Sequence, residues 1–97
     1  MAKATMFSVT AGAARAIADN FLANEIGNLL MADEPFLIDE GRPCWAMTVL
    51  LGNARRGLLG RVGRILVDAE TGDVVLDHEE RERIHANARR LSAHPTS

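Results

Sequence analysis

The stretch RILVDAETGDVVLD, residues 64–77, decides how this chain is expected to fold. Two runs rich in β-branched residues flank a short polar loop, which is the pattern of a β-hairpin. Within the loop, Gly72 supplies the positive φ of a tight turn with a bulge. Asp68 and Thr71 are polar residues whose side chains can bond nearby backbone N–H groups. The sequence therefore predicts a structural turn at Asp68, Thr71 and Gly72.

The acidic loop has one alternative interpretation, a cation site formed by Asp68, Glu70 and Asp73. Its spacing lacks the D-x-[DN]-x-[DN]-G pattern and the terminal bidentate glutamate of a calcium loop. The turn alone accounts for the residue types of the loop, so we expect no metal here.

Before the hairpin, apolar residues recur at steps of three and four from about residue 10 to 27, which predicts an amphipathic helix. Ser8 or Thr10 can cap its start. Gly27 and Asn28 tolerate the left-handed conformation that ends many helices. The apolar stripe consists of Ala14, Ile17, Ala18, Phe21, Leu22 and Ile26.

Between this helix and the hairpin, Pro35 and Pro43 interrupt two apolar runs and favour strands. One strand is expected within about 29–39, broken or edge-like near Pro35, then a turn at 40–43 and a second strand at 44–51. The two faces of the second strand carry Trp45, Met47, Val49 and Leu51 on one side and Cys44, Ala46, Thr48 and Leu50 on the other. Both faces are largely apolar or small, so this strand is predicted to be central.

The segments on either side of the hairpin differ in composition. Residues 52–63 are rich in glycine and arginine and are predicted to be a connection. Residues 78–91 are strongly charged and are predicted to form a second helix with Asp77 as N-cap. Arg89 and Arg90 at its end suit the helix dipole. The helix is expected to dock through Ile84, Ala88 and Leu91.

The composition is that of one folded domain: 97 residues, 47% hydrophobic and 25% charged. The order of elements predicts an α+β fold, in which an N-terminal helix packs on a mainly antiparallel sheet of three to four strands, followed by a C-terminal helix. We expect a single domain over 1–97, with flexible ends at 1–8 and 92–97.

Charge and cysteine content restrict the partners and the compartment. The formal net charge of −2 gives no reason to expect nucleic acid or an anionic membrane. The single cysteine, Cys44, excludes an intrachain disulfide and a zinc site built from several cysteines, as a reducing cytoplasm permits. No run approaches the roughly 20 apolar residues of a membrane helix. We expect a cytoplasmic protein with no membrane partner and no cofactor.

Three stretches together carry a resemblance to known domains: AARAIADNFLAN, EPFLIDEGRPCWAMTVLL and GRILVDAETGDVV. They resemble the small helix-plus-antiparallel-sheet domains of the PepSY and immunity-protein-35 type, in which a tryptophan-bearing strand precedes a strand that ends in a Val-Asp-x-x-Thr-Gly-Glu-Val hairpin. About two thirds of the chain is covered. The stretch LLGNARRGLLGRV is longer and more basic than in those domains, and the charged C-terminal helix has no counterpart. The resemblance implies binding or inhibition of another protein, with no catalytic residues.

The leading hypothesis is a non-enzymatic protein-interaction module. It would act as a homodimer through an apolar sheet face or strand edge, or as an inhibitor or immunity-like partner of another protein. The apolar surface of strand 44–51 exceeds what one helix stripe covers, so a second copy is expected to cover it. The predicted contact residues are Trp45, Met47, Val49, Arg55, Arg56 and Arg61.

The alternative hypothesis is an RNA- or phosphate-binding module that uses the arginines of loop 55–64, namely Arg55, Arg56, Arg61 and Arg64. No tyrosine or phenylalanine is interleaved to stack bases, and no G-x-x-x-x-G-K-[ST] loop is present. Nucleic acid is therefore the less favoured partner.

The least favoured hypothesis is a small thiol or histidine enzyme. Cys44 next to Trp45 could act as a nucleophile, but nothing in the sequence supplies a positioned base. His78, Glu82 and His85 share one helical face, yet the two histidines lie roughly 10 Å apart along the axis, at 1.5 Å per residue. One ion cannot readily bind both. We expect no catalytic residue and no metal site.

Overall fold

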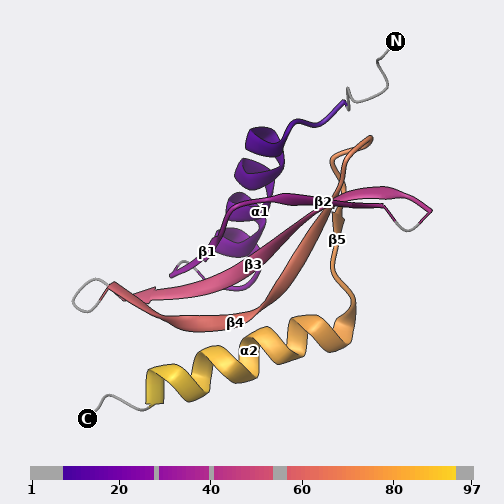
Figure 1. Cartoon of the computed structure of the whole chain (residues 1–97). Helices are drawn as coiled ribbons and strands as arrows, with labels where there is room; N and C mark the ends of the chain where they lie inside the picture. The colour runs from indigo at the N-terminus through magenta and orange to yellow at the C-terminus, as the bar shows by residue number, and fades with distance from the viewer. Residues whose placement is uncertain (1–7, 28, 40, 54–56, 94–97) are drawn as a thin grey trace.

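The computed structural model describes residues 8–27, 29–39, 41–53 and 57–93 of the chain. Its elements are helix α1 (Ala11–Glu25), strands β1 (Leu30–Ala32), β2 (Phe36–Asp39), β3 (Pro43–Asn53), β4 (Gly57–Asp68) and β5 (Val74–Val75), and helix α2 (His78–Ala93). This arrangement confirms the predicted α+β fold with a helix at each end of an antiparallel sheet (Figure 1).

The sheet has five strands rather than three to four. The segment expected to form one strand over 29–39 is divided around Pro35 into β1 and β2. Both pieces pair antiparallel with β3 on the side that β4 does not occupy. β5 pairs with the far side of β4. β3 is therefore a central strand, as its two apolar faces predict.

The prediction of a connection over 52–63 is wrong. β3 continues to Asn53 and β4 begins at Gly57, and these two residues pair across the hairpin. Between them, residues 54–56 lie outside the described part of the chain. The ladder shifts register twice near this end, which is how extra residues are accommodated without ending the strands.

The glycines of this segment leave room for α2. A Cβ on Gly63 would lie 2.5 Å from Cγ1 of Ile84, and one on Gly60 would lie 3.2 Å from Cδ1 of Leu91. Glycine in a strand can mark such a close approach rather than a loop. The helix docks there through the apolar residues that its periodicity indicates, with Ile84 fully buried.

The start of α1 is fixed by Thr10, whose hydroxyl oxygen accepts a hydrogen bond from the Ala13 N–H at 3.1 Å. The helix ends at Glu25, two residues before the predicted end. Its buried side chains are Ala14, Ala18 and Leu22. The alanines let the helix lie close to the sheet, so Ile17, Phe21 and Ile26 of the stripe flank the contact and are only partly buried.

Both helices pack on the same face of the sheet. Residues paired across strands share a face, and Gly63, which lies under Ile84, pairs with Val49. On the same face of β3, the Trp45 indole N–H donates to the Val9 carbonyl just before α1. The shared cluster comprises Ala14, Ala18, Leu22, Met47, Val49, Leu51, Val62, Ile65, Val67 and Ile84, with smaller contributions around it.

Two further predictions concern membrane-spanning helices and the ends of the chain. Neither α1 nor α2 is long and apolar enough to cross a membrane, within the residues that the structure describes. The predicted flexible ends fall largely on residues 1–7 and 94–97, which lie outside the described residues, whereas Ser92 and Ala93 belong to α2.

Candidate interaction surface

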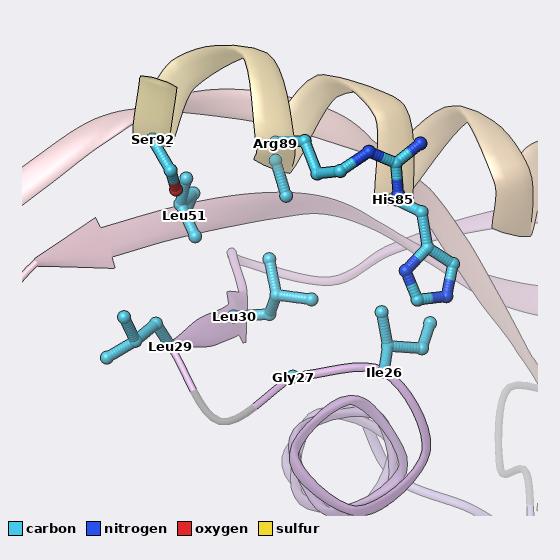
Figure 2. Close-up of a pocket in the computed structure, with 9 residues that line it drawn as sticks. Ile26, Gly27, Leu29, Leu30, Leu51, His85, Arg89 and Ser92 are labelled. Carbon is cyan, nitrogen blue, oxygen red and sulfur yellow. The ribbon is translucent and has the colours of Figure 1, made fainter. Parts of the chain in front are cut away.

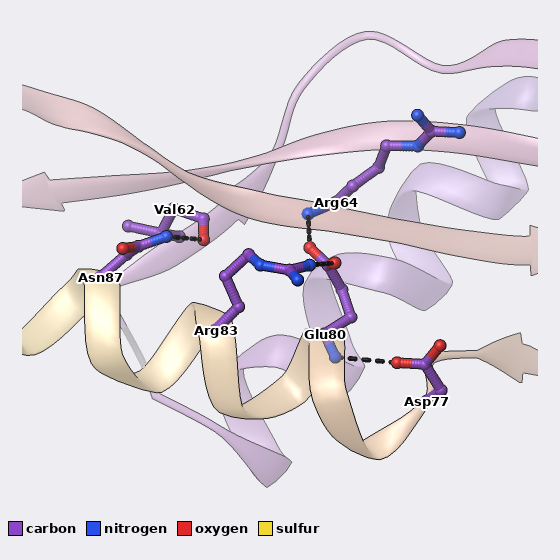
Figure 3. A network of polar contacts seen from close by, with 6 residues as sticks. All are labelled: Val62, Arg64, Asp77, Glu80, Arg83 and Asn87. Atoms are coloured by element: carbon purple, nitrogen blue, oxygen red, sulfur yellow. Dashed lines mark hydrogen bonds and ion pairs between the residues drawn. The ribbon is translucent and has the colours of Figure 1, made fainter.

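The outer edge of β4 is covered by α2 (Figure 3). The Glu80 carboxylate accepts a hydrogen bond from the Arg64 backbone N–H at 2.9 Å and also pairs with Arg83. Seven residues further along α2, the Asn87 side-chain amide donates to the Val62 carbonyl at 2.9 Å. Helix side chains thus occupy backbone groups that an added strand would need.

The first turn of α2 is capped by Asp77. The Asp77 carboxylate accepts a hydrogen bond from the Glu80 N–H at 2.8 Å, as expected of an N-cap. This contact holds the first turn in place, so the Glu80 side chain is directed at the strand (Figure 3).

The outer edge of β1 is covered by α1. The Asp19 carboxylate accepts a hydrogen bond from the Ala32 N–H at 2.7 Å, and the Arg15 Nε donates to the Ala32 carbonyl at 3.1 Å. Arg15 also lies 3.7 Å from the Glu34 carboxylate in an exposed ion pair. One residue of β1 thus has both backbone groups occupied by helix side chains, which blocks pairing there.

The edge of β2 is different, because none of the described residues provides a comparable cover. Phe36 is 50% exposed and Leu37 is 39% exposed. The strand FLID carries one charge, Asp39, and no proline within it. A strand of this kind at a sheet edge is a template for pairing with another chain.

The register shows which backbone groups of β2 are available. Pro43 pairs with Asp39, has no N–H, and its carbonyl accepts from the Ala69 N–H on the opposite side. Pairs in an antiparallel ladder alternate between hydrogen-bonded and non-hydrogen-bonded. Asp39 and Pro43 therefore form a non-hydrogen-bonded pair. In such a pair the N–H and C=O of Asp39 point away from β3. Those of Leu37, two residues earlier, do the same.

An apolar strip crosses the face of the sheet opposite to the helices and reaches this edge. Its members are paired across four strands: Phe36, Ala46, Leu66 and Val75. Phe36 and Val75 at its two ends are 50% and 38% exposed, while Ala46 between larger neighbours is buried. The strip adds apolar surface next to the open backbone groups of β2.

The predicted contact residues of β3 lie mostly in the core. Met47 and Val49 have no exposed surface, and Trp45 is partly buried and packs against the same cluster. The expectation that a second copy covers Met47 and Val49 is wrong, because the helices of the same chain cover that face. Phe36 and Leu37 are absent from the predicted contact residues, although Pro35 directly before them is typical of an edge strand.

The arginines expected to bind an anion are only partly described. Arg61 and Arg64 are exposed and pair with Leu50 and Thr48, so both lie on the face without helices. Arg55 and Arg56 lie outside the described residues. Arg61 belongs to β4 and not to a loop, so its position is set by the sheet.

The residues of the predicted turn join β4 to β5. Asp68 is buried, and one carboxylate oxygen accepts from the Glu70 N–H at 2.7 Å and the Thr71 N–H at 2.9 Å. Gly72 has φ of 82°. The N–H groups of Thr71 and Glu70, followed by the Arg42 guanidinium at 3.1 Å, hold the pKa of Asp68 below its ordinary value. The carboxylate is thus used to fix the chain reversal.

The Cys44 thiol and the acidic residues were the other candidates for a reactive or metal-binding site. Burial, followed by the nearby Asp68 charge, raises the pKa of Cys44 above 9.0. The thiol is therefore protonated near neutral pH, where the protonated form is a poor nucleophile. Within the described parts of the chain, no group of three or more His, Cys, Asp and Glu residues could hold a metal ion.

These features define a class: a small α+β protein whose antiparallel sheet is covered by helices on one face and at two of its edges, with β2 uncovered. Comparisons of the chain with protein-family models, with curated proteins and with solved structures found no match.

Proposed function

We propose that this chain is a non-enzymatic protein-interaction module that forms a homodimer by pairing β2 of one copy with β2 of a second copy. The observation that carries the proposal is the uncovered edge of β2, which contrasts with the helix-covered edges of β1 and β4. Adding a strand to such an edge is a common mode of protein recognition, in which backbone hydrogen bonds supply affinity.

The geometry of β2 suits pairing with itself. A two-fold axis at Ile38 places Leu37 of one copy opposite Asp39 of the other. Both residues direct their N–H and C=O groups outward, so they exchange two hydrogen bonds, and the axis repeats the exchange. Such an interface is self-complementary and closes after two copies.

Apolar burial adds to the backbone contacts. Phe36 lies on the face without helices, and pairing at β2 brings the apolar strips of the two copies together. Fully burying a side chain of this size contributes roughly 1.5–3 kcal/mol, and about half of Phe36 remains to be buried. Because the strand has only four residues, we expect association at tens of micromolar chain rather than an obligate dimer.

The same edge can accept a strand from a different protein. The resemblance to PepSY and immunity-protein-35 domains, which implies binding or inhibition of another protein, supports this second form of the proposal. The free, buried thiol of Cys44 suits a reducing compartment such as the cytoplasm.

Sedimentation equilibrium at tens of micromolar tests the homodimer. The Leu37→Pro variant removes an N–H that points away from β3, a position where an edge strand tolerates proline. We expect about twice the chain mass for the wild type and the chain mass for Leu37→Pro.

A matched control separates the edge from general surface hydrophobicity. Leu58 on β4 is 60% exposed, so Leu58→Lys should leave the dimer intact, whereas Leu37→Lys should dissociate it. A monomeric wild type contradicts the homodimer. A dimer that survives both Leu37 variants but is lost in Val75→Lys would place the interface on the apolar strip instead of the edge.

A further inference from the structure

A recess of about 260 Å³ lies between the end of α1 and the second half of α2, on the face of the sheet that the helices cover (Figure 2). Its apolar lining includes Ile26 after α1, Leu30 on β1 and Leu51 on β3. Leu30 and Leu51 are paired and buried, so they form a fixed apolar floor.

The polar side chains of the recess all come from α2. His85, Arg89 and Ser92 follow one another at steps of four and three, which places them on one side of the helix. In Figure 2 the His85 ring lies opposite Ile26 and the Ser92 hydroxyl lies near Leu51. None of the residues that line the recess is acidic. The recess thus has an apolar floor and a rim of hydrogen-bond donors with positive charge.

Arg89 differs from the other arginines of α2. Those arginines each have a partner: Glu25 for Arg81, Glu80 for Arg83 and Asn87 for Arg90. Across the described parts of the chain, the Arg89 guanidinium has no ion pair and no hydrogen bond. Among the arginines of α2, the one without a hydrogen-bond or ion-pair partner in the described residues is therefore the one that lines the recess.

We infer that this recess binds a small carboxylate with an apolar tail. The carboxylate pairs with the Arg89 guanidinium, whose planar fork matches two carboxylate oxygens. Ser92 and His85 are within the same lining and supply further hydrogen bonds. The tail lies on Ile26, Leu30 and Leu51, where it displaces water from apolar surface.

The size of the recess narrows the class of ligand. A volume of about 260 Å³ lies slightly below the range of about 300–1,000 Å³ that is typical of small-molecule sites. That suits a small ligand, such as the medium-chain carboxylate octanoate. The inference does not depend on the β2 dimer, because no residue of β2 lines the recess.

Isothermal titration of the full chain with octanoate tests the inference, with n-octanol as the uncharged comparison. We expect saturable binding of octanoate, and binding of octanol weaker by about tenfold or more, because octanol lacks the charge that pairs with Arg89. Equal binding of the two would overturn the assigned role of the arginine, and absence of saturable octanoate binding at millimolar concentration would overturn the site.

Two variants locate the binding. Arg89→Gln should weaken octanoate by about tenfold, the loss of one charge-assisted pair, while octanol binding stays unchanged. Arg90→Gln, which removes an arginine that contacts Asn87 outside the recess lining, should bind octanoate as the wild type does. Both side chains are exposed, so thermal melts should show folded proteins. Equal weakening by the two variants would indicate non-specific charge attraction and contradict the site.

Discussion

The edges of β4 and β2 both carry backbone N–H and C=O groups that point out of the sheet, but among the described residues helix side chains bind these groups only along β4. Along β4, Glu80 and Asn87 of α2 bond the strand directly. Along β2, exposed Phe36 and Leu37 adjoin backbone groups that point outward. The difference teaches that a helix can block an edge by side-chain contacts alone, and that an edge without them is a place to expect a partner.

The largest expected effect is at the covered edge, where α2 lies directly on Gly63. A Cβ there would lie 2.5 Å from Cγ1 of Ile84 and 2.8 Å from a Glu80 carboxylate oxygen. Gly63→Ala should therefore lower the free energy of unfolding by about 1–3 kcal/mol, the usual cost of overpacking. Urea denaturation measures it.

Gly12 supplies the matched control for that substitution. Nothing lies within 4 Å of a Cβ placed on Gly12 in α1, so Gly12→Ala should stabilise the protein by about 0.5–1 kcal/mol. Similar denaturation midpoints for the two alanine variants would show that α2 does not pack against Gly63 of β4 as closely as described.

The next largest loss of stability is expected at the edge of β1 that α1 covers. Asp19→Ala removes the acceptor of the part-buried Ala32 N–H, and leaving such a donor without a partner costs about 1 kcal/mol or more. Asp39→Ala on the open β2 removes an exposed carboxylate and should stay within about 0.5 kcal/mol of the wild type. Thermal or urea unfolding of both variants measures the difference in their unfolding free energies. Equal values would show that the Asp19 side chain does not bind the edge of β1.

Acid unfolding measures how much the Asp68 carboxylate stabilises the turn between β4 and β5. The pKa of Asp68 is lowered in the folded state, so its contribution is present above the ordinary value of 3.8 and is lost as pH falls through the lower folded value. Asp68→Asn should give a flatter loss of stability below about pH 4. Arg42→Gln should keep most of the wild-type slope, since the backbone N–H groups of Thr71 and Glu70 are the larger cause. Unfolding midpoints across a pH series decide this.

The smallest effect on folding is expected at the open edge itself. Leu37→Lys should change the unfolding free energy of the dilute monomer by less than about 0.5 kcal/mol, because the side chain is 39% exposed and lies at the edge of the sheet. Urea denaturation at low micromolar chain measures it. A loss of several kcal/mol would mean that Leu37 belongs to the core and not to an interaction surface.

Local signals in the sequence determined several elements of this protein. Thr10 and Asp77 cap the two helices with their own side chains, and Gly72 adopts the positive φ that the chain reversal requires. The apolar or small residues on both faces of 44–51 indicated a central strand, and Pro35 indicated where the first strand breaks. These features could be predicted because each depends on residues only a few positions apart.

The tertiary structure alone decided the rest. Gly60 and Gly63 belong to a strand and not to a loop because Leu91 and Ile84, which are distant in sequence, pack over them. Met47 is in the core because both helices lie on the same face of the sheet. Likewise, whether an edge strand is open depends on which helix side chains reach it, and no local pattern records these contacts, which join residues 13 to 25 positions apart. The candidate interaction surface at β2 is defined by where those contacts are absent among the described residues, so only the folded chain could reveal it.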